Sequence, residues 1–283
     1  MMKIKRKLLL AICLASLCLV AAPPARADLY GTADVQYDQL VRGVGQLTST
    51  FTDSIGTYHG VPLTDVGLHN LNISNLDLPG NGNTTSDGVT ADADIPSGSY
   101  LNAGYTLAFC VDLTDPMSRV FENYKVVSLN DTPDPTADPT FNGVGNGMGV
   151  VRAAYIAELL NTNTYATPYA AAAVQVAIWE IVDENFSGGA SSWDVSNGQG
   201  DFYLEYTVGG GSIEETIAGL ANTMLNGLPV LTPSLSIADR YTALTNQFPN
   251  KQVQDYVVVP APAAVLLGIL GLGVAGWRLR RFA

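Results

Sequence analysis

The chain has 283 residues, with 26 acidic and 14 basic side chains and a formal net charge of −12. Eight of the basic residues lie in the first 27 and the last 27 positions, which contain no Asp or Glu. The residues between these ends therefore hold six basic and 26 acidic groups, a net charge of −20. Because of Coulomb repulsion, nucleic acid and anionic membrane surfaces are poor partners for this central part.

The N-terminus has the pattern of a secretory signal peptide over residues 1–27. Basic residues precede an apolar stretch from Leu8 to Ala22, and Ala25-Arg26-Ala27 fits a small-x-small cleavage site. Two of the three cysteines lie in the apolar stretch, so the exported chain keeps Cys110 alone. Oxidising compartments favour disulfide pairs, and a single thiol there is unusual. We therefore expect Cys110 to have a partner other than cysteine, or a reason to remain free.

The central part has the length of one large domain or of two small lobes. Strand patterns lie toward its two ends and helix patterns in its middle, which predicts an α+β fold. The expected strands cover residues 35–40, 105–113, 124–129, 202–208 and 253–259. The expected helices cover residues 150–160, 168–182 and 212–225.

Apolar residues alternate along the strand that carries Cys110. Cys110 shares one face with Asp112, and the opposite face has the pattern of a core face; its members are Tyr105, Leu107, Phe109, Val111 and Leu113. We therefore expect Cys110 to point away from the main apolar layer.

The second expected helix carries Gln175 in the run Ala173-Val-Gln-Val-Ala-Ile-Trp179. Thr167 fits the N-cap, and Pro168 fits the first helical position, where a missing N–H is tolerated. Trp179 follows Gln175 by one turn and is expected to shield its amide. The third helix begins at Ser212-Ile-Glu-Glu215, the pattern of a capping box.

The chain shows no pattern for a metal or for a familiar hydrolytic site. Its two histidines, His59 and His69, lack the spacing of metal ligands, and no Ser-His-Asp arrangement or pair of carboxylates stands out. We expect no cofactor and no catalytic turnover.

The C-terminal residues 257–283 form a second signal. Val259-Pro-Ala-Pro262 precedes an apolar run that ends at Trp277, and three arginines follow. Residues 257–277 are long enough to cross a bilayer, and a simple membrane anchor with its arginines at the cytoplasmic side is the alternative to the sorting signal that we favour below. The arrangement also resembles the PEP-CTERM sorting signal of Gram-negative bacteria, with Ala261 in place of the glutamate. That resemblance implies processing by an exosortase and a position at the cell surface or in the extracellular matrix.

The central motifs resemble the thioester domain of bacterial surface adhesins. That family has an aromatic-Cys-aliphatic-acid strand and a Thr-Gln-x-Ala helix, and its Cys and Gln are joined by an internal bond. Here Cys110 and Gln175 match the joined positions, and Ala177 matches the motif alanine, whereas Val174 replaces the threonine. The likeness covers residues 103–225 within the expected ectodomain, residues 28–256. The fold then expected is a β-sandwich or barrel-like sheet lobe with an inserted small helical lobe that carries Gln175.

The resemblance implies covalent capture of a partner. A Cys110–Gln175 thioester stores an electrophile that a protein amine or a polysaccharide hydroxyl on a surface macromolecule can attack. Trp179 and Tyr155 are expected to cover the bond, and Asp112 to orient nearby hydrogen bonds. Because the bond forms once and is consumed once, the protein is not expected to be an enzyme.

Other interpretations remain open at this point. The domain can be a structural protein of the cell surface or matrix without the bond, and Cys110 can be an inert thiol or form an intermolecular disulfide. A Cys-dependent hydrolase is also open, but it requires a histidine close to Cys110 in the fold.

Overall fold

The computed structural model describes residues 29–52, 57–77, 104–113, 117–132, 148–183, 193–229, 241–246 and 253–259. The predicted signal peptide and residues 260–283 of the predicted sorting segment lie outside these residues. Within these residues, seven antiparallel strands form one sheet and three α-helices accompany it, so the predicted α+β class is confirmed.

The strands are β1 (Leu29–Thr52), β2 (Thr57–Asp77), β3 (Gly104–Cys110), β4 (Glu122–Ser128), β5 (Phe202–Leu204), β6 (Thr242–Asn246) and β7 (Tyr256–Val259). The helices are α2 (Gly149–Thr162), α3 (Pro168–Asp183) and α4 (Ile213–Asn226), and a 3₁₀ turn, η1 (Leu129–Asp131), follows β4. All three helices overlap the ranges expected from the sequence.

Six strands are paired in a closed ring. β1 pairs with both β2 and β4, and the remaining pairings run from β2 through β3, β7 and β6 back to β4. Of the strands that the structure describes, β5 alone lies outside the ring, where it pairs with residues 49–51 of β1. A closed ring has no free edge strand of the kind that promotes aggregation.

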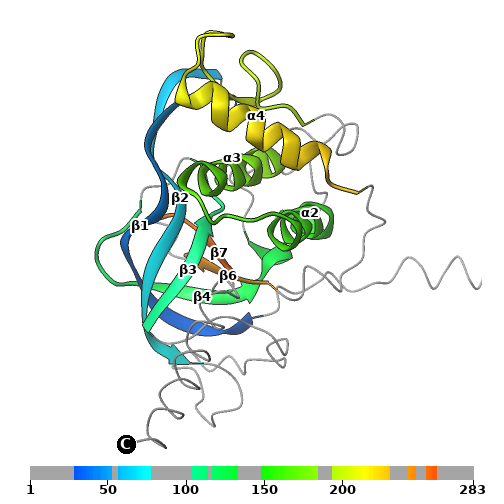
Figure 1. Cartoon of the computed structure of the whole chain (residues 1–283). Helices are drawn as coiled ribbons and strands as arrows, with labels where there is room; N and C mark the ends of the chain where they lie inside the picture. The colour runs from blue at the N-terminus through cyan, green and yellow to red at the C-terminus, as the bar shows by residue number, and fades with distance from the viewer. Residues whose placement is uncertain are drawn as a thin grey trace, which may run out of the picture.

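α3 and α4 contact the long ribbon formed by β1 and β2, and α2 packs against α3 and η1 (Figure 1). α3 packs on both strands and contacts α2 and α4, so it is the central helix of the group. Every residue of α3 from Ala171 to Asp183 is buried. The caps follow the sequence: Thr167 Oγ1 accepts a hydrogen bond from the Ala170 N–H, and Ser212 Oγ accepts one from the Glu215 N–H.

At the end of β3, from Ala108 to Cys110, both faces of the strand are buried, which corrects the expectation that Cys110 points away from the core. On its face, Thr106, Ala108 and Cys110 are at most 5% exposed, whereas Tyr105 on the supposed core face is 70% exposed. The ring closure explains the difference, because the Cys110 face points into the ring and the opposite face turns toward α3.

Two strands differ from expectation. β2 and β6 were not expected from the sequence. The three valines at positions 257–259, where the sorting segment was expected to begin, belong to β7 and pair with β3.

The ribbon of β1 and β2 depends on a close contact between two glycines. Gly43 and Gly67 are register partners, and a Cβ on Gly67 would lie 2.2 Å from the carbonyl oxygen of Arg42. Gly67 also has a φ of +147°, which side-chain-bearing residues rarely adopt.

We predict that Gly67→Ala lowers the free energy of unfolding by roughly 3 kcal/mol or more, because the strands must separate. Urea denaturation measures this. The control is Gly45→Ala, on the same ribbon, where a Cβ meets nothing within 4 Å and the change is expected to be small. Equal effects of the two substitutions would contradict the prediction.

Candidate functional site

The site forms where the end of β3 meets α3. Val111 donates its N–H to Asp255 O, so the main-chain groups of Cys110, one residue earlier, face the opposite edge of β3. On that edge the described pairing with β2 ends at Ala108. The side chain of Gln175 takes the place of a strand there.

Gln175 makes two hydrogen bonds to the main chain of Cys110. The Cys110 N–H donates to Gln175 Oε1 at 2.9 Å, and Gln175 Nε2 donates to the Cys110 carbonyl oxygen at 2.8 Å. Gln175 is 0% exposed, so its carboxamide is fixed in a dry environment against Cys110. The two motif residues matched from the sequence are therefore neighbours in the fold.

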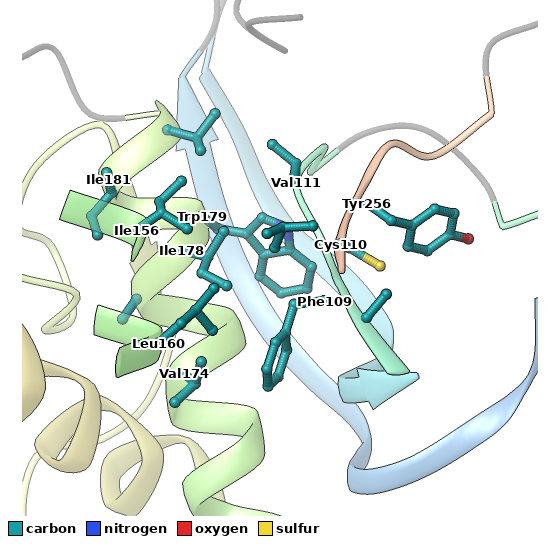
Figure 2. Packing of buried hydrophobic residues seen from close by; sticks show 14 of the residues in the cluster. Phe109, Cys110, Val111, Ile156, Leu160, Val174, Ile178, Trp179, Ile181 and Tyr256 are labelled. Atoms are coloured by element: carbon teal, nitrogen blue, oxygen red, sulfur yellow. The ribbon is translucent and has the colours of Figure 1, made fainter. Parts of the chain in front are cut away.

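The thiol of Cys110 has a different partner. Its Sγ lies 3.2 Å from His69 Nδ1, on the neighbouring strand β2. Figure 2 shows the sulfur on the side of β3 that faces Tyr256, away from α3. The Gln175 carboxamide and the Cys110 thiol thus lie in different directions from the Cys110 main chain.

The other nitrogen of His69 fixes the tautomer. His69 Nε2 lies 2.6 Å from the carbonyl oxygen of Asp65, which can only accept a hydrogen bond. Nε2 therefore carries the proton, and Nδ1 is the acceptor. It follows that the Cys110 S–H donates to His69 Nδ1, the arrangement of a nucleophile beside a general base.

Tyrosines from other strands surround the imidazole. The ring of Tyr37 lies edge-on to His69 at 5.4 Å, and the ring of Tyr256 lies at 6.4 Å on another side. Tyr256 in turn lies 6.1 Å from Tyr124. Because these side chains come from separate strands of the ring, the thiol and imidazole lie in its interior.

Burial keeps both reactive groups neutral. It raises the pKa of the Cys110 thiol well above its usual range, and the carboxylates of Asp112 and Asp65 add to the effect. Burial also lowers the pKa of His69 from 6.5 to about 4, although its contacts with Asp65 oppose this change. At neutral pH the pair is a thiol and an imidazole rather than an ion pair.

Asp112 connects three segments around the site. Its main-chain oxygen accepts hydrogen bonds from Trp179 Nε1 at 3.1 Å and from Gln254 Nε2 at 2.8 Å. Its carboxylate accepts one from the Asp255 N–H at 2.5 Å. Asp112 therefore holds Trp179, one turn after Gln175, against the end of β3, as Figure 2 shows for the indole ring.

Tyr155 lies farther along the helical group. Its ring packs edge-on against Trp193 at a centroid distance of 4.7 Å, and the hydrogen bonds that fix Cys110 and Gln175 do not involve it. Its expected role as a cover thus has less geometric support than that of Trp179.

His69 is the site residue that the sequence did not reveal, because β2 itself was not expected. One signal was present: Leu71 and Ile73 follow His69 at intervals of two, which places all three on one face of a strand. His59, by contrast, has a side chain 68% exposed and lies 3.9 Å from Glu205. In the part of the chain that the structure describes, no group of three His, Cys, Asp or Glu side chains could hold a metal ion.

Comparison with known proteins gives no relative: no protein-family model, curated protein or solved structure matches the chain. Among the helices with described residues, none is long and apolar enough to cross a membrane.

We predict that Gln175→Ala lowers the free energy of unfolding by roughly 2–5 kcal/mol, because it leaves the buried N–H and C=O of Cys110 unpaired. Chemical denaturation measures the change. Gln46→Ala, at an exposed position of β1, is the matched control and is expected to change stability little. A loss as small as that of the control would show that the two bonds contribute nothing.

We also predict that stability falls as the pH falls from 6.5 toward 4. In this range the unfolded chain binds a proton at His69 that the folded chain does not, so acid favours unfolding, by up to about 3 kcal/mol at the lower end. Denaturation across this pH range measures the slope. His69→Gln should remove this contribution and His59→Gln should keep it; the reverse result would contradict the assignment.

Proposed function

We propose that this chain is an exported surface protein that forms an internal thioester between Cys110 and Gln175 and uses it to capture a partner covalently. The partner class is a surface macromolecule that presents an amine or a hydroxyl group. We further propose that the strand ring is a barrel-like lobe and that the stretch from α2 to α4 is the inserted helical lobe that carries Gln175. Residues 1–27 direct export, and the C-terminal segment directs exosortase-type sorting through the membrane.

The observation that carries the proposal is the hydrogen bond from the Cys110 N–H to Gln175 Oε1. When sulfur attacks the carboxamide carbon, negative charge develops on this oxygen, and a fixed donor in a dry site stabilises that charge. The second bond, from Gln175 Nε2 to the Cys110 carbonyl, holds the future leaving group in place. The electrophile is thus fixed on the residue that supplies the nucleophile, which reduces the entropic part of the barrier.

The reaction balances without a cofactor. Cys110 Sγ bonds to Gln175 Cδ, the bond from Cδ to Nε2 breaks, and the thiol proton leaves on the nitrogen as ammonia. In the capture step, an amine or hydroxyl of the partner attacks Cδ and forms an amide or ester, the bond from Cδ to Sγ breaks, and the proton of the nucleophile passes to Sγ, which restores the Cys110 thiol. The site is used once.

Burial of the site supports a stored electrophile. Cys110 and Gln175 are at most 1% exposed and Trp179 is 4% exposed, so bulk water has little access to the bond. The partner must therefore displace part of this cover before its nucleophile reaches the carbonyl. Such gating restricts reaction to a partner that binds first.

A structural protein without the bond is the second candidate. The observation in its favour is that the two hydrogen bonds of Gln175 already satisfy its carboxamide and the main chain of Cys110. The hydrolase alternative has the histidine that it requires, but His69 and Cys110 are each 1% exposed. A hydrolase must admit substrate to its sulfur in every cycle, and this conformation provides no such access.

Intact-protein mass of the full chain, expressed with its own export segment, tests the proposal. We predict that the mature wild-type protein lacks the mass of one ammonia and that Cys110→Ala restores it. Once denaturant opens the buried site, added methylamine should convert the wild type to a methylamide and free one thiol for alkylation. A wild type of full mass with a free thiol would favour the structural candidate instead.

A further inference from the structure

We propose that His69 is the proton-transfer residue of this site: its Nδ1 accepts the Cys110 thiol proton as Sγ attacks Gln175 Cδ and then delivers it to the departing nitrogen. The inference rests on the proposed thioester. In the capture step the same nitrogen takes a proton from the incoming amine or hydroxyl and returns it to Cys110 Sγ. No atom other than the released ammonia leaves the protein.

The need for such a residue follows from the burial of the thiol. A thiolate is the attacking species in sulfur chemistry, yet the environment of Cys110 strongly disfavours a free thiolate. A base in direct contact takes the proton and becomes an imidazolium, so the thiolate that forms has a positive charge beside it and is not an isolated negative charge. His69 Nδ1 is 3.2 Å from Sγ and is the acceptor in its tautomer.

The position of Nδ1 also suits the return of the proton. Cys110 Sγ lies next to His69 in the ring interior, and the carboxamide lies on the main chain of the same cysteine. Sulfur turns about its Cα–Cβ bond to reach Cδ and gives up its hydrogen bond to His69, since the proton remains on the imidazole. The imidazolium then gives this proton to the nitrogen that leaves, so His69 acts first as base and then as acid.

The other polar groups near the pair have fixed partners of their own. Tyr37 Oη donates to the carboxylate of Asp65 at 2.9 Å, and the carboxylate of Asp112 accepts from the Asp255 N–H. Burial raises the pKa of Tyr37 and of Tyr256, so both phenols keep their protons and cannot serve as bases. Arg119, the nearby cation, lies over the ring of Tyr37. His69 is thus the neutral acceptor in contact with the sulfur.

The test follows bond formation in the full chain during refolding from denaturant, with ammonia release and intact mass as readouts. We expect His69→Gln to form the bond about 10²–10⁴-fold more slowly than the wild type, because proton transfer by a positioned side chain contributes on that order. His59→Gln is the matched control, since it removes the chain's other, exposed histidine, and it should react at the wild-type rate.

The pH dependence of the wild-type rate provides a second measurement that does not need a folded variant. Proton transfer from a neutral thiol to a neutral imidazole predicts a flat rate between about pH 5 and pH 8. Attack by a free thiolate predicts a tenfold rise with each pH unit over the same range.

The outcomes separate the two proposals. A slow His69→Gln variant or a flat profile supports the role of His69. A wild type that loses ammonia with a tenfold rise per pH unit, or a folded His69→Gln variant that reacts at the wild-type rate, overturns that role and leaves the thioester in place. A wild type that never loses ammonia overturns both.

Discussion

The position of the helical group on the strand ring depends on the paired hydrogen bonds between Gln175 and Cys110. The other buried residues of α3 are mostly alanine, valine and isoleucine, whose contacts are non-directional and would tolerate a small rotation or slide of the helix. The carboxamide of Gln175, which is 0% exposed, does not tolerate such a movement, because an unpaired amide in a dry interior costs about 1–3 kcal/mol. Gln175, together with the hydrogen bond from Trp179 Nε1 to Asp112 O, therefore fixes the register of α3 against the end of β3.

The helices could be predicted because their signals are local. Thr167 and Pro168 mark the start of α3, and Ser212 with Glu215 marks the start of α4, all within a few residues of the elements that they define. The strand ring could not be derived in the same way. β2 has consecutive buried residues from Val66 to His69 rather than clean alternation, because Gly67 crosses closely over β1. That crossing also requires a glycine at position 43, the register partner of Gly67, which is distant in the sequence.

The same difference between local and non-local signals explains which residues of the site can be predicted from the sequence and which cannot. Cys110 and Gln175 could be paired from motifs, since each lies in a recognisable local context. The direction of the thiol could not, because alternation divides a strand into two faces without saying which one a closed ring turns inward. The position of His69 depends on the same ring closure, because His69 lies beside Cys110 only when β2 pairs with β3.

The structural and the covalent function require different groups of Cys110. A clamp between α3 and β3 uses only main-chain N–H and C=O groups, which any residue at position 110 other than proline supplies. A purely structural role gives no reason for a thiol at position 110. It also gives no reason for the acceptor nitrogen of His69, Nδ1, to lie 3.2 Å from that thiol. Burying a neutral histidine also makes the fold sensitive to acid, which an aliphatic side chain would avoid. The covalent reading uses every one of these features: main chain to hold the amide, sulfur to attack it, and imidazole to carry the proton that burial would otherwise keep on the sulfur.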